Sequence, residues 1–272
     1  MTLSGRIRTV CLLLMAVTAI PLDAAAEPPG IDAITRQIAD RPDDPRLYDL
    51  RAQLYSAASE HAKAIADLGR AIELKPEDLQ LVDARGSERL LAGKFEQAIA
   101  DFDRYLAKHP RQGPYHWKRG IALYYAGRYD DGVKQFDTHQ TVNSADVENA
   151  VWRFLCMARR DGVKKAEQDL LKIGPDSRVP MAQIYELFAG KSTAEDVLQA
   201  ARAGDPTEQE LRVRLFYTHL YIGLYLDAQG KPADALEHMK LAAKDYLVDH
   251  YMGGIAVVHV PVLQATLKQQ AK

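Results

Sequence analysis

A period of 34 residues constrains the fold of this chain more than any other feature. Pro42, Pro76 and Pro110 recur at this spacing, and other residue types recur between them. The further residues that keep the period are Arg51, Arg85, Arg119 and Arg153, Gly86 and Gly120, Gly93 and Gly127, and Phe102 and Phe136. A period of this length is typical of a helical solenoid, in which no unit buries its apolar face alone.

Three units in phase carry the pattern, at 45–78, 79–112 and 113–146. Small residues near unit positions 8 and 20 allow two antiparallel helices to approach, and larger residues at 4, 11 and 24 fill the space between them. A proline ends the second helix of a unit. This arrangement resembles the tetratricopeptide (TPR) repeat, whose signature is W-x2-L-G-x2-Y, then A-x3-F-x2-A, then P. The resemblance implies an all-α, right-handed superhelix of antiparallel helix pairs.

The pattern weakens after residue 146, where Phe154 replaces a small residue and Gly162 comes one residue late. Two shorter helices are expected at 181–189 and 193–203, then one long helix at 208–226. The segment 257–261 could be extended or helical, and Pro261 argues slightly against a continuous helix. The expected organisation is a signal peptide (1–26), an N-terminal capping helix (27–44), four TPR units (45–180), a divergent helical pair (181–215), a C-terminal TPR-like unit (216–249) and a terminal cap (250–272).

The N-terminus has the pattern of an export signal. Arg6 and Arg8 precede an apolar run at 10–20, and three alanines at 24–26 offer a cleavage site. The run is too short to span a bilayer as a helix, although an uncleaved anchor is the alternative. Removal of 1–26 leaves 33 basic and 36 acidic residues, so the net charge is −3. We therefore expect an exported soluble protein, periplasmic or extracellular, that binds no nucleic acid and does not insert stably into membranes.

Arginine occupies unit position 7, which is usually apolar in the family, in four successive units. Unit position 23 lies on the second helix of the same unit, and it carries aspartate in three units and glutamine in one. Because these positions face each other across a helix hairpin, the pattern predicts ion pairs or hydrogen bonds between them. The predicted pairs are Arg51–Asp67, Arg85–Asp101, Arg119–Gln135 and Arg153–Asp169.

The chain carries no motif with an established catalytic chemistry. Cys156 lies between Leu155 and Met157 on an expected helix, where a buried structural thiol is favoured over a nucleophile. The eight histidines, among them His250 and His259, show no metal-ligand spacing. The sequence thus predicts no catalytic site, no metal and no cofactor. The enzyme alternative is a small hydrolase that uses Cys156 or the pair His250 and His259.

The TPR resemblance implies a partner-binding surface on the concave face, formed by the first helix of each unit. The implied residues are Asp49, Gln53, Asp83, Ser87, Leu90, Trp117, Ile121, Tyr124, Tyr125 and Val151. This groove would be polar at one end and aromatic at the other, and aromatic anchors are common in peptide recognition. The alternative is that the C-terminal units fold against the aromatic residues and cover them.

The sequence therefore predicts a non-catalytic adaptor or scaffold that binds a protein or peptide in the concave groove. An export signal followed by a few TPR units is also similar to the periplasmic TPR lipoprotein family called new lipoprotein I, whose members are adaptors for proteases and cell-wall hydrolases. This chain lacks the lipid-attachment cysteine, because Cys11 lies early in the apolar run. A homo-oligomeric structural protein of the envelope is the alternative.

Overall fold

The computed structural model describes residues 30–271, and the predicted signal peptide lies outside them. Within this range the chain forms helices and loops. The helices are α1 (Ile31–Asp40), α2 (Pro45–Ala57), α3 (His61–Leu74), α4 (Leu79–Leu91), α5 (Phe95–Lys108), the 3-10 helix η1 (Pro110–Tyr115), α6 (Trp117–Tyr125), α7 (Tyr129–Gln140), α8 (Val147–Asp161), α9 (Val163–Gln168), α10 (Met181–Phe188), α11 (Ala194–Arg202), α12 (Glu208–Ala228), α13 (Pro232–Lys240), the π-helical turn η2 (Leu241–Asp245) and α14 (Tyr251–Gln270).

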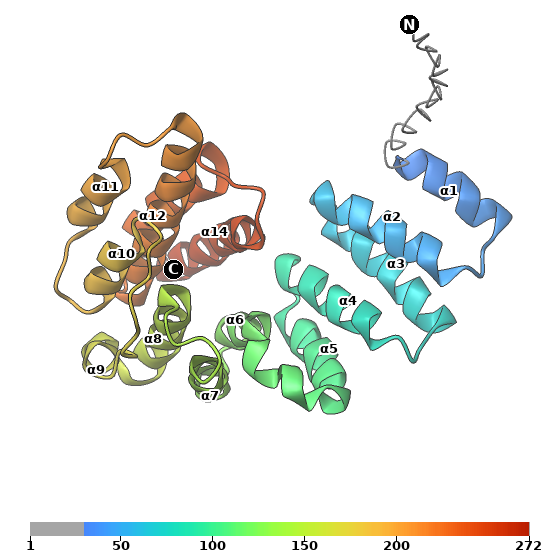
Figure 1. The fold of residues 1–272 in the computed structure, drawn as a ribbon, viewed down its shortest axis with the longest axis horizontal. Helices are drawn as coiled ribbons and strands as arrows, with labels where there is room; N and C mark the ends of the chain where they lie inside the picture. The colour runs from blue at the N-terminus through green and yellow to red at the C-terminus, as the bar shows by residue number, and fades with distance from the viewer. Residues whose placement is uncertain (1–29, 272) are drawn as a thin grey trace, which may run out of the picture.

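Successive helices pack as antiparallel pairs, and the pairs stack side by side along a curved path (Figure 1). The predicted all-α solenoid is confirmed. The pairs α2–α3, α4–α5 and α6–α7 correspond to the three units in phase, and α8–α9 to the weaker fourth unit. In the fourth unit α9 ends at Gln168, and a loop of residues 169–180 follows where the sequence pattern breaks.

The glycines at unit position 8 allow the close approach that the repeat requires. A Cβ atom at Gly86 would lie 2.6 Å from the ring of Phe102, and one at Gly120 would lie 2.5 Å from the ring of Phe136. Both rings are fully buried. The repeated pairing of glycine and phenylalanine therefore lets the aromatic ring of one helix lie directly on the backbone of its partner.

The predicted arginine contacts form in three of the four units. Arg51 binds both carboxylate oxygens of Asp67 at 2.7 Å, and Arg85 binds those of Asp101 at 2.9 and 2.8 Å. The third contact, Arg119 Nη1 to Gln135 Oε1, is 3.2 Å long. The prediction for the fourth unit is wrong in its detail. Arg153 donates to the backbone carbonyl of Asp169, and the Asp169 carboxylate accepts from a lysine instead.

Three of these arginines also reach the second helix of the preceding unit, at unit position 25. Arg51 donates to Thr35 at 3.1 Å, Arg119 to Asp103 at 2.6 Å, and Arg153 to Asp137 at 2.5 Å. These partners explain why arginine, and not the usual apolar residue, occupies unit position 7. A forked guanidinium binds two acceptors at once, so it connects neighbouring units as well as the two helices of one unit.

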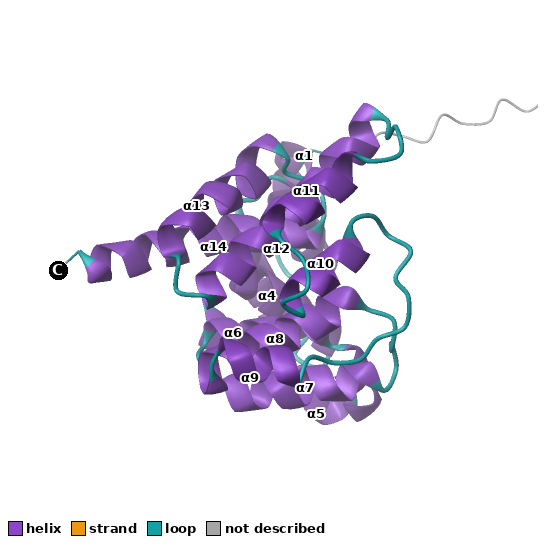
Figure 2. Cartoon of the chain, turned by 90° about the vertical axis from the view of Figure 1, so that its left-hand side faces the viewer, coloured by secondary structure: helices purple, strands orange, loops and turns teal. Residues whose placement is uncertain are grey.

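The terminal cap forms one continuous helix, α14, although Pro261 argued slightly against helix at this point of the sequence. Pro261 lies inside α14, and the residue four positions before it, Val257, is 48% exposed. Water can therefore solvate the carbonyl that loses its helical partner. Figure 2 shows the last turns of α14 projecting from the body of the molecule. No helix within residues 30–271 is long and apolar enough to cross a membrane.

The start of α14 returns to the N-terminal half of the solenoid (Figure 1). The Tyr251 hydroxyl donates to the carbonyl of Ser87 at 3.1 Å. Gly254 approaches Leu91 so closely that a Cβ would lie 2.7 Å from Leu91 Cδ2. The C-terminal helix thus contacts α4 and bounds the concave face on one side.

Candidate functional site

A cleft of about 530 Å³ opens between α2 and α4 on the concave face. Asp49 and Asp83 hold the same position in successive units, as do Gln53 and Ser87, and all of these residues line the cleft. Lys118 of α6 and Tyr251 of α14 lie at its far end. The repeat therefore places equivalent side chains of two units side by side in one open space.

Carboxylates dominate the electrostatics of this cleft. Glu88 is buried and accepts hydrogen bonds from Ser56 at 2.7 Å and His61 at 2.8 Å. Asp83 lies 2.7 Å from His116 Nε2. Among the described residues, by contrast, only Gln53 donates to the carboxylate of Asp49, from one helical turn away on the same helix. Asp49 is thus the carboxylate most available to a ligand.

Lys118 is the one cationic side chain among the described residues that line the cleft. Its ammonium group donates to Ser87 Oγ at 3.1 Å and lies 4.7 Å from the centre of the Tyr251 ring. Burial lowers the pKa of Lys118, although the nearby carboxylates of Asp83 and Glu88 act in the opposite direction. Three carboxylates face this single lysine, so the cleft is acidic.

A second hollow of about 620 Å³ continues the cleft towards the loop before α14. The two hollows share residues of α2, α4 and α14, including Ser56, Leu91 and Tyr251. Ser59 and His61 line one wall of the second hollow, and residues 247–250 line the other. Together the two hollows form a groove between the first units and the C-terminal segment, which we call the α2/α4 groove.

The polar half of the predicted binding surface lies in this groove, and the aromatic half does not. Four predicted residues are buried in the core, namely Leu90, Ile121, Tyr124 and Val151. Tyr125 is half-buried, and its hydroxyl lies 3.1 Å from His259 of α14. Trp117 is half-buried with its ring edge-on to Tyr251, the ring centres 5.4 Å apart. Residues of the C-terminal helix thus lie against Trp117 and Tyr125, and both rings keep part of their surface exposed.

A buried polar cluster holds α14 in this position. His259 lies between the Tyr125 hydroxyl and the carboxylate of Asp227, whose nearest oxygen is 3.4 Å from Nε2. Arg159 donates to the same carboxylate. Burial by itself raises the pKa of Asp227, but His259 and Arg159 together lower it below its usual value. An Asp–His–Tyr arrangement can relay protons, yet His259 is fully buried, so a substrate cannot reach it.

The other candidates for an enzyme site, Cys156 and His250, make contacts that belong to the fold. Cys156 is fully buried, and burial raises its pKa to about 12, so a reactive thiolate is strongly disfavoured. Its sulfur packs where a Cβ atom at Gly132 would lie. His250 is exposed, and its ring accepts a hydrogen bond from the Met252 amide at the start of α14. Within residues 30–271, no group of three or more ligating side chains is arranged to hold a metal.

Solved structures with similar folds are TPR proteins. The crystal structure of a tetratricopeptide repeat protein from Parabacteroides merdae superposes with a TM-score of 0.51 at 15% identity, over 86% of this chain and 91% of that one. The fold is a TPR solenoid. YrrB, described as a TPR protein with an unusual peptide-binding site, is also similar, with a TM-score of 0.43 at 17% identity over 84% of this chain and 98% of that one. No protein-family model matches the sequence, and no curated protein matches it.

Three residues of the groove were missed at the level of sequence. Lys118 directly follows Trp117, a predicted concave residue, so the TPR pattern could have pointed to Lys118 as well. Glu88 is a buried acid at an unremarkable unit position, and its two hydrogen-bond partners come from another helix pair. Tyr251 reaches the groove from 164 residues further along the chain than Ser87. No local pattern contains that information.

Proposed function

We propose that this protein is a non-catalytic interaction module that holds a segment of a protein partner in the α2/α4 groove. The observation that carries the proposal is the stacking of equivalent concave side chains from two units in one open cleft. Asp49 and Gln53 are presented by one rigid helix, and Asp83 by the next. Because helices present these side chains, the backbone that carries them is already ordered before a partner binds.

The charge of the groove indicates the kind of segment that it would hold. Asp49, Asp83 and Glu88 line its first cleft, and Lys118 is the one lysine or arginine among the described residues that line it. A segment with one or more lysines or arginines would complement this surface, whereas an acidic segment would be repelled. Complementary charge acts mainly on specificity and on the rate of association, so binding should weaken as the salt concentration rises.

We further propose that the protein acts after export, as an adaptor for envelope proteins. The support is the N-terminal pattern of Arg6 and Arg8, the apolar run and the alanine cleavage site. The similarity to the new lipoprotein I family points in the same direction. Envelope extract is therefore the appropriate source of partners.

The test compares two matched double variants in affinity capture from envelope extract. Asp49→Ala with Gln53→Ala removes an exposed carboxylate–amide pair within the groove, whose atoms are 3.1 Å apart. Glu195→Ala with Gln199→Ala removes an equivalent pair on α11, 3.3 Å apart and outside the groove. The wild type and the α11 variant should recover the same proteins, and the groove variant should lose them. Equal recovery by all three would refute the groove as the binding surface.

A further inference from the structure

The α2/α4 groove has two chemically different halves. Asp49 and Asp83 place carboxylates in the first cleft, of about 530 Å³. Leu91, Leu247 and Val257 are among the residues that line the second hollow, of about 620 Å³. Leu247 is 37% exposed and Val257 is 48% exposed, so large apolar side chains remain in contact with water there. Exposed apolar surface next to polar groups is typical of a site that a partner covers.

Asp49 is the carboxylate of the first cleft that a partner's cation can bind. Within residues 30–271 it accepts from the neutral amide of Gln53 and from no cation. Asp83 already lies 2.7 Å from His116, and Glu88 is buried and accepts from two side chains. A lysine or arginine of a partner would therefore form its charge-assisted hydrogen bonds with Asp49.

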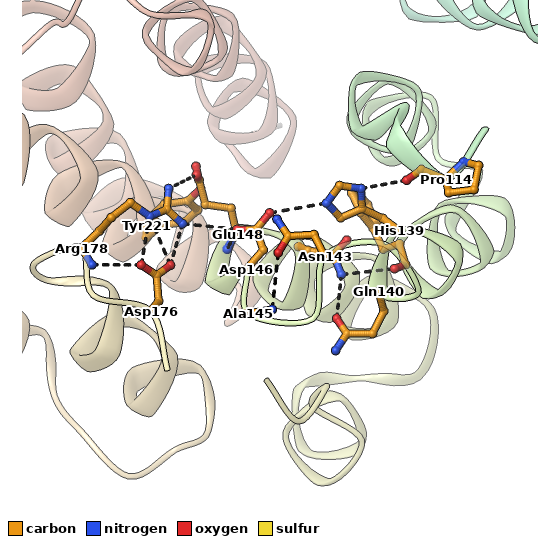
Figure 3. Close-up of polar contacts among 12 residues, drawn as sticks. Pro114, His139, Gln140, Asn143, Ala145, Asp146, Glu148, Asp176, Arg178 and Tyr221 are labelled. Atoms are coloured by element: carbon orange, nitrogen blue, oxygen red, sulfur yellow. Dashed lines mark hydrogen bonds and ion pairs between the residues drawn. The ribbon is translucent and has the colours of Figure 1, made fainter. Parts of the chain in front are cut away.

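A second group of carboxylates, at the start of α8 and in the loop 169–180, is neutralised by the protein itself (Figure 3). Arg178 donates to Glu148 at 2.8 Å, to Asp146 at 3.3 Å and to Asp176 at 2.6 Å. The other oxygen of Glu148 accepts from the Tyr221 hydroxyl at 2.5 Å. Because Arg178 supplies the cation, these carboxylates do not compete with Asp49 for a basic residue of a partner.

Lys118 limits the number of cations that the groove accepts. Its side chain is half-buried, and its ammonium group donates to Ser87 Oγ at 3.1 Å and lies 4.7 Å from the centre of the Tyr251 ring. Tyr251 lines both the first cleft and the second hollow. A second basic residue placed near Tyr251 would meet the ammonium of Lys118, and like charges in a half-buried site repel each other.

The helix α2 sets the distance between the two halves. Asp49 lines the first cleft, and Ser56, seven positions further along α2, lines both hollows. A helix rises about 1.5 Å per residue, so these positions are about 10 Å apart along its axis. An extended chain spans this distance with about three residues. We propose that the groove binds a segment with a single lysine or arginine at Asp49 and an apolar side chain in the second hollow, about three positions away. This inference rests on the proposed function and specifies the class of segment.

The experiment selects binders to the immobilised full chain from a library of random 12-residue peptides displayed on phage. Enriched sequences should contain one basic residue and an aliphatic or aromatic residue about three positions from it, in one fixed order. An enriched sequence is then synthesised with a fluorophore, and its affinity for each variant is measured by fluorescence anisotropy. Circular dichroism confirms that each variant is folded.

Two pairs of matched variants test the two halves separately. Asp49→Asn keeps the shape of the side chain and removes its charge, so affinity should fall about tenfold. Asp32→Asn removes the same charge from an exposed position on α1, outside the groove, and should leave affinity unchanged. Val257→Asn should lower affinity about fivefold by removing apolar contact. Val213→Asn, at a 38% exposed position on α12 outside the groove, should not.

A third pair tests the exclusion of a second cation. Replacing the apolar residue's neighbour in the peptide with lysine should weaken binding to the wild type and to Lys108→Met, an exposed control on α5, but not to Lys118→Met. Enriched sequences without the basic and apolar pair, or equal affinities of Asp49→Asn and Asp32→Asn, would overturn this inference. The proposed function would then stand if the Asp49→Ala, Gln53→Ala variant still lost its captured partners. A selection that enriches no sequence, together with unchanged capture by that variant, would overturn both.

Discussion

Replacing Gly120 with alanine tests the packing that defines the repeat. The added Cβ would lie 2.5, 2.8 and 3.0 Å from three atoms of the Phe136 ring, whereas ordinary contacts lie at 3.4–4 Å. The ring must therefore move by about 1 Å within a core that is close-packed. Overpacking of this kind costs about 1–3 kcal/mol, and the higher helix propensity of alanine offsets about 1 kcal/mol of it. We expect a net loss of about 1 kcal/mol in the free energy of unfolding.

Gly69→Ala is the matched control, because Gly69 also lies inside a helix but no atom comes within 4 Å of its added Cβ. This substitution should stabilise the protein by about 1 kcal/mol, since only helix propensity changes. Urea denaturation followed by circular dichroism should separate the two variants by about 2 kcal/mol, equivalent to about 4–8 °C in melting temperature. Phe136→Leu should partly rescue Gly120→Ala, because it removes ring atoms that clash. Shifts of the same sign and size in both glycine variants would contradict this account of the repeat.

Three other outcomes follow from buried polar groups. Asp101→Asn should lower the free energy of unfolding by about 3 kcal/mol, because Asp101 is buried and accepts from two arginines. Asp169→Asn, at an exposed lysine pair, should lower it by less than about 1 kcal/mol. Urea denaturation compares the two variants, and equal losses would contradict this account of the ion pairs. Cys156 should react with a thiol reagent only on unfolding, because burial raises its pKa to about 12, so rapid labelling of the native protein at pH 8 would be inconsistent with the structure. Burial and the neighbouring His238 lower the pKa of His219 to about 4. Below about pH 6.5 the unfolded state therefore binds more protons than the folded state. The free energy of unfolding should fall as the pH is lowered from about 6.5 to 4. His219→Gln should flatten this slope, and an unchanged slope in unfolding measurements across that range would show that another group is responsible.

The helices of the first three units could be predicted because their pattern is local and repeated. Each proline, glycine and phenylalanine of the period specifies a turn, a close contact or a core position within about 34 residues. The arginine contacts followed from the same spacing, and they failed only at Asp169, where α9 ends early. The exposure of the concave face could not be predicted in this way. It depends on where α14 lies, and that helix meets Ser87 across 164 residues of sequence.

The composition of the concave face explains why one half is covered and the other is open. In the third and fourth units, unit positions 5 and 9 carry the apolar residues Trp117, Ile121, Val151 and Leu155, and exposing them would cost about 25 cal/mol for each Å² of apolar area. The start of α14 lies against this surface at Trp117 and Ile121, and it adds the Tyr125–His259 contact. In the first and second units the corresponding positions are Asp49, Gln53, Asp83 and Ser87. An apolar helix laid over them would bury the Asp49 carboxylate, for which the described residues supply Gln53 as a neutral donor and no cation, and burying an unpaired charge is costly. The same carboxylates that make the groove acidic therefore keep an apolar helix from covering it. A partner that occupies the groove must supply positive charge or hydrogen-bond donors to these carboxylates.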